Sequence, residues 1–156
     1  MKWIDVSLFI TLFMTGLYAG IGFFTLMGGN PAVSLLSDHT FAEFWQRVDG
    51  FMGKRMPVFG PLLMLSIIVS IVLLIPERKE ISFWLMVFSL FIIIVDLVFT
   101  LSINHPLNQL IQSWDLQQLP DNVQVIKSKV YNAFNYRSAF MIGSFVFALL
   151  SVWSRK

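Results

Sequence analysis

Four long apolar stretches dominate the pattern of hydrophobic and polar positions along this chain. They cover residues 4–27, 57–75, 81–103 and 134–153, and polar connections separate them. At a rise of about 1.5 Å per residue, each stretch is long enough to cross the hydrocarbon layer of a bilayer, roughly 30 Å thick, as a helix. The pattern therefore predicts an all-α protein built on a bundle of four transmembrane helices.

The connection before the second stretch predicts a helix of its own. Its apolar side chains recur at helical spacing between charged ones, at Phe41, Phe44, Trp45, Val48 and Phe51. Because residues 37–55 are too polar to span, we expect an amphipathic helix that lies at the membrane interface as a lid on the bundle. Pro57 and Pro61 would then open the second span, since proline is tolerated in a first helical turn.

The connection after the third stretch predicts a second interfacial segment. Pro106 lacks a backbone donor, so we expect the third span to stop or kink there. A short helix over residues 107–114 and another after the Pro120-Asp121-Asn122 start signal would follow. The predicted fold is an all-α, four-transmembrane-helix bundle with two interfacial amphipathic helical segments, forming one integral membrane domain over residues 1–156.

Composition supports a membrane protein and limits its partners. Of the 156 residues, 56% are hydrophobic and 13% are charged, and the mean hydropathy is +0.74. The net charge of +2 comes from few charges and contains no basic tract, so nucleic acid is not an expected partner. The oligomeric state stays open.

The distribution of basic residues predicts the orientation. They are densest at the two ends and in the short turn after the second span, at Lys2, Arg78, Lys79, Arg155 and Lys156. Cytoplasmic loops carry an excess of Lys and Arg, so we expect both termini in the cytoplasm. The membrane we expect is a bacterial inner membrane.

Several kinds of chemistry are excluded by residue type. The chain has no cysteine, which rules out disulfides, thiol redox chemistry and iron–sulfur clusters. Its two histidines, His39 and His105, lack the helical ligand spacing of a metal site and do not lie mid-span, as haem ligands would. We expect no metal and no cofactor.

One carboxylate lies well inside an apolar stretch. Asp96 belongs to the third span, and insertion of such a residue costs about 2.5–3.5 kcal/mol at the bilayer centre. It should therefore face the bundle interior and have a partner. Arg137, near the start of the fourth span, is the candidate for an ion pair, and the phenol of Tyr18 in the first span also needs a partner.

Residue counts from the span ends place polar residues of three spans at a similar depth in the membrane. Tyr18, Asp96 and Ser144 lie roughly 12–15 Å below the same surface and could meet. We predict a polar pocket within the membrane, with Asp96 or His105 as a base and Arg137 stabilising an anion. Its lining would come from Tyr18, Thr25, Trp45, Thr100, Asn104, Trp114, Asn135 and Ser144. Two alternatives stay open: Asp96 and Arg137 simply hold two spans together, or they belong to an ion or proton path.

Small residues in the first span predict close helix packing. Gly16 and Gly20 form a small-xxx-small pair, which lets another helix approach. A stripe of small or hydroxyl-bearing residues shares one face of this span, namely Ser7, Thr11, Tyr18, Gly22 and Thr25.

Several short motifs resemble a known family. They are Gly16-Leu17-Tyr18-Ala19-Gly20 followed by Pro31-Ala32, Asn104-x-Pro106-Leu107 closing the third span, and an aromatic and Asn-containing stretch leading to Arg137. Over nearly the whole chain they look like the anthrone oxygenase-like family of small four-span membrane proteins, many of which are known only as a domain of unknown function.

That resemblance implies an activity. Some fungal members oxidise an anthrone to an anthraquinone with molecular oxygen and no obvious cofactor. Asn104, Pro106 and Arg137 are the family-like positions, whereas Phe134 stands where several relatives have a histidine. We therefore expect a binder of a hydrophobic or aromatic small molecule, with oxygenase-like oxidation as one form. The alternative is a non-enzymatic membrane component in which Asp96 and Arg137 are a helix–helix ion pair.

Overall fold

A computed structural model of the chain describes residues 3–155. Every regular element in that range is a helix or helical turn. The order is α1 (Trp3–Phe24), η1 (Thr25–Gly29), α2 (Asn30–Ser34), α3 (Asp38–Leu74), η2 (Ile75–Glu77), α4 (Ile81–Phe99), η3 (Thr100–Asn104), α5 (His105–Gln112) and α6 (Val123–Ser154).

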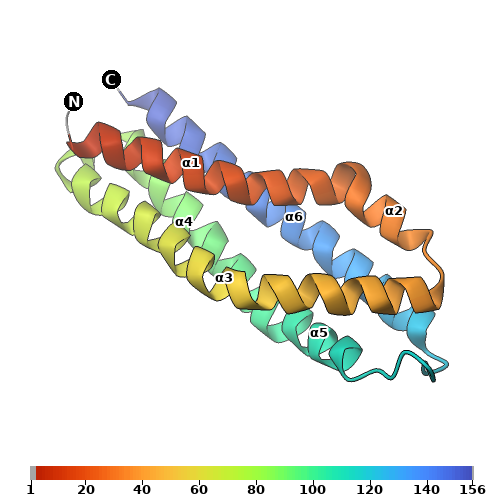
Figure 1. Ribbon diagram of the computed structural model, residues 1–156. Helices are drawn as coiled ribbons and strands as arrows, with labels where there is room; N and C mark the ends of the chain where they lie inside the picture. The colour runs from red at the N-terminus through yellow and green to blue at the C-terminus, as the bar shows by residue number, and fades with distance from the viewer. Residues whose placement is uncertain (1–2, 156) are drawn as a thin grey trace.

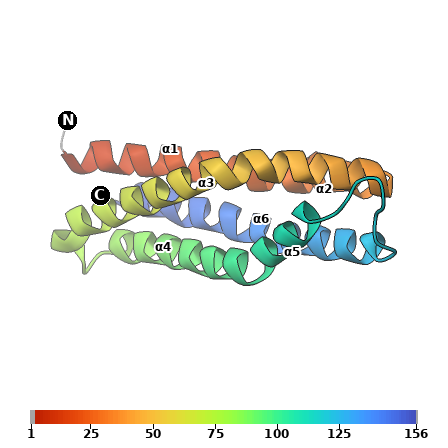
Figure 2. The ribbon, with the colours of Figure 1, turned by 60° about the horizontal axis from the view of Figure 1, so that its bottom comes forward.

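These elements join into four helical arms long and apolar enough to cross a membrane. The arms are Trp3–Ser34, Asp38–Glu77, Ile81–Gln112 and Val123–Ser154. Figure 1 shows the two ends of the described chain at the same end of the bundle, and Figure 2 shows α6 lying between α1 and α4, the two helices it contacts most. The predicted all-α bundle is confirmed, and the protein is an integral membrane protein. Lys2 and Lys156, which contributed to the orientation prediction, lie outside the described residues.

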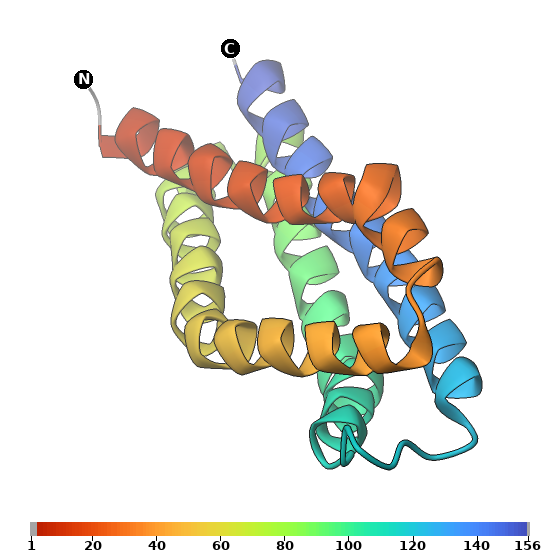
Figure 3. The same ribbon diagram turned by 45° about the vertical axis from the view of Figure 1, so that its right-hand side comes forward.

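The expected break between the interfacial helix and the second span does not occur. α3 runs without interruption from Asp38 to Leu74, with Pro57 and Pro61 inside it. An internal proline removes a backbone hydrogen bond and bends a helix without necessarily ending it. Figure 3 shows the bend: the half before the prolines runs across the bundle, whereas the half after them runs alongside α4.

α6 is also longer than the predicted fourth span. The expected helix after Asn122 and the span over residues 134–153 form one helix, Val123–Ser154. No glycine or proline occurs between Val123 and Tyr136, so nothing in the sequence interrupts the helix there. In the third arm, Pro106 opens α5 directly after the wide turn η3, so the helix continues into a short segment beyond the span.

Irregular backbone gathers at one level of the bundle. The π turns η1 and η3 begin 22 and 19 residues from the helix ends near the termini, and Pro57, the first proline of α3, lies 17 residues from Leu74. At about 1.5 Å per residue this level is 25–33 Å away, close to the thickness of the hydrocarbon layer. The regular part of the bundle therefore corresponds to one bilayer, and a second layer of helical segments lies beyond it.

Each part has its own core. The transmembrane part buries Leu63, Ile67, Leu74 and Met86, and hydroxyl pairs link its helices, including Ser7 with Ser70 at 2.8 Å. The second layer buries a separate cluster made of Phe41, Trp45, Ile111, Val123, Ile126 and Val130. At the end near the termini, Arg155 pairs with Asp5 and with Glu77, each at 3.0 Å.

The glycine at the closest helix approach is not one of the predicted pair. A Cβ at Gly20 would meet nothing within 4 Å, and one at Gly16 would make ordinary contact with Phe145 at 3.5 Å. A Cβ at Gly22 would lie 3.1 Å from the Cβ of Met141 and 3.1 Å from the carbonyl oxygen of Ser138. Gly22 therefore permits the close contact between α1 and α6.

Gly22, at the close helix contact, and Gly20, in open space, provide a matched pair of positions for testing the packing of α1 on α6. We expect Gly22→Leu to destabilise the fold by about 1–3 kcal/mol, because the new side chain overpacks the α1–α6 contact. Gly20→Leu faces open space and should leave stability unchanged. Thermal denaturation of the purified proteins in one detergent compares them. Equal stability of the two variants would contradict the close packing of α1 on α6.

Candidate functional site

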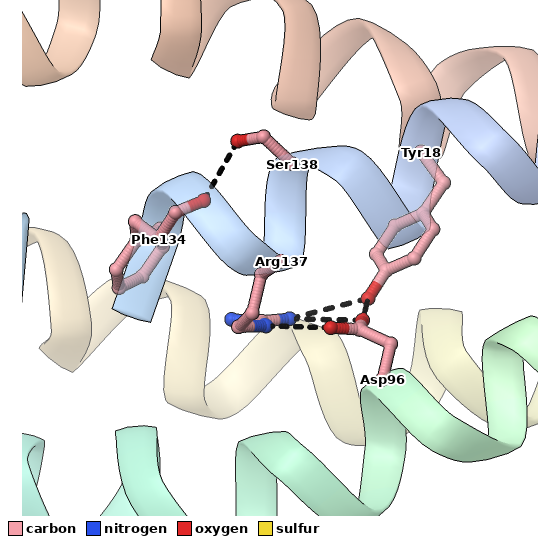
Figure 4. A network of polar contacts seen from close by, with 5 residues as sticks. All are labelled: Tyr18, Asp96, Phe134, Arg137 and Ser138. Carbon is pink, nitrogen blue, oxygen red and sulfur yellow. Dashed lines mark hydrogen bonds and ion pairs between the residues drawn. The ribbon is translucent and has the colours of Figure 1, made fainter. Parts of the chain in front are cut away.

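A buried polar triad joins three transmembrane helices (Figure 4). Arg137 of α6 donates from Nε to Asp96 Oδ1 of α4 at 3.0 Å and from Nη2 to Asp96 Oδ2 at 3.4 Å. Tyr18 of α1 donates its hydroxyl to Asp96 Oδ2 and accepts from Arg137 Nη2 at 3.2 Å. The side chains of Arg137 and Asp96 are only 10% and 2% exposed, so the ion pair suggested by the sequence is present and buried.

Helical periodicity places these residues. The buried positions of α4 follow spacings of 4, 3, 4 and 3, through Ser82, Met86, Ser89, Ile93 and Asp96. Arg137 continues a similar buried stripe on α6, between Ala133 and Met141. Because both stripes face the bundle axis, the carboxylate and the guanidinium meet there instead of facing lipid.

The hydrogen bonds of the triad limit what each group can do. Both oxygens of Asp96 already accept hydrogen bonds, and the guanidinium neutralises its charge. This arrangement favours Asp96 as a residue that positions Arg137. No described residue accepts a hydrogen bond from Arg137 Nη1, and Figure 4 shows one guanidinium nitrogen directed away from Asp96. The guanidinium carbon lies 5.3 Å from the centre of the Phe134 ring.

Beyond Asp96, the same arm holds buried polar atoms that have no hydrogen-bond partner among the described residues. Asn104 is 1% exposed, and neither its Nδ2 nor its Oδ1 has a hydrogen-bond partner among the described residues. The buried Oγ1 of Thr100 is also unpaired within residues 3–155. Thr100 and Asn104 bound the π turn η3, and such turns are frequent at functional sites. A buried unpaired amide is costly, by about 1–3 kcal/mol, and calls for an explanation.

The remaining predicted lining residues near this level have local partners. Thr25 donates to the carbonyl of Ile21 at 2.8 Å, and Asn135 accepts from Asn30 Nδ2 at 2.9 Å. Trp45 donates from Nε1 to Asn108 Oδ1 at 3.0 Å. Trp114 packs against the second core cluster. These residues lie in or next to the layer beyond the triad, and their polar groups mainly fasten its segments together.

Two predicted residues do not join the triad. Ser144 pairs with Ser89 Oγ at 3.0 Å, so the expected meeting of Ser144 with Tyr18 and Asp96 is wrong. Ser144 lies seven residues beyond Arg137, two helical turns nearer the termini, and therefore reaches a different level of α4. His105 opens α5 as an exposed residue.

Sequence reasoning missed several residues around the site. The ring of Phe134 lies edge-on to Trp45, with ring centres 5.2 Å apart, and so separates it from Arg137. Asn108 donates to Asp49 Oδ1 at 2.6 Å and fastens α5 to α3. Only the position of Phe134, three residues before Arg137, was visible as a signal in the sequence. The partner of Asn108 depends on how two distant segments pack.

Two surface hollows lie away from the triad. One, about 620 Å³, lies along the connection from α5 to α6 and is lined by Leu110, Trp114, Leu119 and Asn122 among others. The other, about 440 Å³, lies at the turn over residues 75–80. Neither includes Asp96 or Asn104. Because Asn104 is only 1% exposed, a molecule that contacts it requires movement of the side chains around η3.

Comparisons of the chain with protein-family models, with curated proteins and with solved structures give no match. The geometry of the buried residues is therefore the main guide to a function.

The ion pair predicts a strong energetic coupling. We expect Asp96→Asn and Arg137→Gln each to destabilise the protein by about 3–5 kcal/mol, because each leaves the other charge buried and unpaired. The double variant should lose less than the sum of the two. Unfolding of the purified protein in mixed detergent measures the three changes.

Two exposed charged residues provide the control for this double-mutant cycle of Asp96 and Arg137. Asp121→Asn and Arg47→Gln remove an acid and a base that lie at the surface, and both should leave stability nearly unchanged. Strictly additive effects of Asp96→Asn and Arg137→Gln would show that the two side chains do not interact in the folded protein.

Proposed function

We propose that this integral membrane protein binds a small hydrophobic or aromatic molecule at the polar region between α4 and α6. The observation that carries the proposal is Asn104, buried with both amide atoms unpaired. Buried polar atoms in folded proteins have partners in nearly all cases, so an orphaned amide at a π turn indicates a missing partner. A bound molecule supplies that partner.

The unpaired groups define what such a molecule offers. Asn104 presents the two N–H donors of its Nδ2 and the acceptor Oδ1, Thr100 a hydroxyl, and Arg137 Nη1 a cationic donor. A carbonyl or phenolic oxygen on an otherwise apolar molecule complements this set. The ring of Phe134 beside Arg137, with Trp45 packed against its other side, suits a flat ring system. In this proposal Asp96 and Tyr18 hold the guanidinium in place.

The resemblance to the anthrone oxygenase-like family extends the proposal to an oxidation. A methylene group of the substrate becomes a carbonyl at the expense of molecular oxygen, and water leaves. The reaction starts with loss of a substrate proton, and Arg137 stabilises the oxyanion that forms. Asp96 acts as a base only after Tyr18 releases Oδ2, because both carboxylate oxygens accept hydrogen bonds.

A second candidate function is purely structural. It is supported by the completeness of the triad, in which every oxygen of Asp96 is bonded by Arg137 or Tyr18. On this proposal the triad fixes the registry of α1, α4 and α6, and buried water satisfies Asn104. The protein would then be a non-enzymatic membrane component.

We also propose that the end of the bundle holding both termini faces the cytoplasm, in a bacterial inner membrane. The basic residues Arg78, Lys79 and Arg155 lie at that end. They are concentrated in short segments at that end, whereas the long connections carry basic residues diluted by acids, namely Arg47, Lys54, Arg55, Lys127 and Lys129. A high density of Lys and Arg close to the spans is the bias of cytoplasmic segments.

Replacement of Asn104 distinguishes a role in binding a small molecule from a role in stabilising the fold. Asn104→Leu keeps the volume of the side chain and removes the two unpaired polar atoms, so stability should stay equal or rise. If the proposal holds, the amount of co-purifying small molecule per protein, measured by mass spectrometry, falls about tenfold or more. The exposed Asn132→Leu on α6 is the matched control and should retain the molecule.

The two candidate functions then give opposite results. Retention of the same molecule at the same occupancy in wild type and Asn104→Leu contradicts binding at Asn104. A wild-type protein that carries no small molecule above the detergent background, and whose stability does not depend on Asn104, supports the structural function.

A further inference from the structure

The half of α3 before its prolines has two apolar faces. The inner face buries Phe41 and Trp45 in the second core cluster. On the outer face, Phe44, Val48 and Phe51 follow helical spacings of 4 and 3 and are 43%, 37% and 61% exposed. A helix lying on a protein in water usually carries polar residues on its outer face. This stripe therefore indicates an apolar environment outside the protein.

The cations at the end of this stripe have no carboxylate partner. Lys54 and Arg55 are exposed, and no ion pair joins either to an acid within residues 3–155. The guanidinium of Arg55 lies 5.1 Å from the centre of the Phe51 ring, so it borders the apolar stripe directly.

Nearby acids are already engaged elsewhere. Glu43 pairs with Arg47 at 2.7 Å. Asp49 accepts from Asn108 at 2.6 Å and from Gln112 at 3.2 Å, both on α5. Because these amide donors are uncharged, Asp49 keeps its negative charge, and residues 43–55 carry a net charge of +1 from three basic and two acidic side chains. Asp49 is directed to α5, whereas the two cations at the end of the stripe are exposed and complement an anionic surface.

The position of these cations matches the edge of the bilayer. Arg55 lies 19 residues before Leu74, the last residue of α3, which corresponds to about 29 Å along the helix. Leu74 is close to the Asp5, Glu77 and Arg155 cluster at the opposite edge of the bundle. Lys54 and Arg55 thus fall where the phosphates of a leaflet lie, and Figure 3 shows the first half of α3 running across the bundle at that level.

We propose that Phe44, Val48 and Phe51, together with Lys54 and Arg55, form a surface that docks on the leaflet around the bundle. The apolar stripe enters the boundary between headgroups and acyl chains, and the two cations bind the phosphates of anionic phospholipids. This interaction is separate from the small-molecule site at Asn104. It anchors the bent half of α3 in the plane of the membrane.

Site-specific fluorescence tests the apolar part. The chain has no cysteine, so Val48→Cys can be labelled at one position with bimane. Gln117→Cys, exposed in the connection before α6, is the control. In proteoliposomes we expect the label at position 48 to be quenched by lipids brominated near the headgroup and protected from aqueous iodide, and the label at position 117 to behave oppositely.

Two outcomes of this experiment overturn the proposal. Equal quenching of both labels by iodide would place the stripe in water. Disulfide formation between two copies of unlabelled Val48→Cys, with protection from both quenchers, would show that a second copy of the chain covers the stripe.

Charge replacement tests the lipid preference. In the Val48→Cys protein we compare quenching by brominated phosphatidylglycerol and by brominated phosphatidylcholine. Near an anionic headgroup each cation contributes about fivefold to attraction, so we expect a several-fold preference for phosphatidylglycerol. Lys54→Gln with Arg55→Gln should abolish it, whereas Lys54→Arg with Arg55→Lys should retain it. The same preference in all three proteins would overturn the role of these cations.

Discussion

The cost of placing a charge inside a bilayer governs this structure. Asp96 has no water to solvate it at its depth, so the protein must supply a counter-charge and hydrogen bonds from within. Arg137 and Tyr18 do so, and they come from two further helices. The requirement therefore fixes the register of α1, α4 and α6 together. Few apolar contacts could specify it as strongly, because lipid tails compete with apolar side chains for the same surfaces.

Other polar contacts between the helices follow the same rule on a smaller scale. Hydroxyl groups meet across helices in pairs, such as Ser7 with Ser70 and Ser89 with Ser144. Each pair satisfies groups that would otherwise be exposed to hydrocarbon. Asn104 is an exception to this pairing of buried polar groups. It is as deeply buried as Asp96, yet its amide has no partner within the described chain. That contrast between a fully satisfied triad and an orphaned amide nearby is the basis for assigning a ligand to this region.

The backbone changes where the polar region meets the membrane edge. α1 and α4 widen into π turns, and α3 bends at its prolines, whereas α6 continues unbroken. Irregular backbone near the membrane is tolerated where it is buried in protein or lines a polar space. The second layer, held by Trp45, Asn108 and Asp49, covers this level. The small molecule of the proposed function would have to pass this layer to contact Asn104.

Residue types along the chain were enough to predict the membrane class and the number of spans, and they made Arg137 the candidate partner of Asp96. Span length and hydropathy follow directly from residue type, and Asp96 and Arg137 are the charged residues that lie more than one position inside the apolar stretches. Three features required the packed structure: the continuity of α3, the close helix contact at Gly22 instead of Gly20, and the pairing of Ser144 with Ser89. The packed structure also decided that Asn104 is left unpaired among the described residues. These features depend on the rotation and offset of one helix against another, which the periodicity of a single segment does not encode.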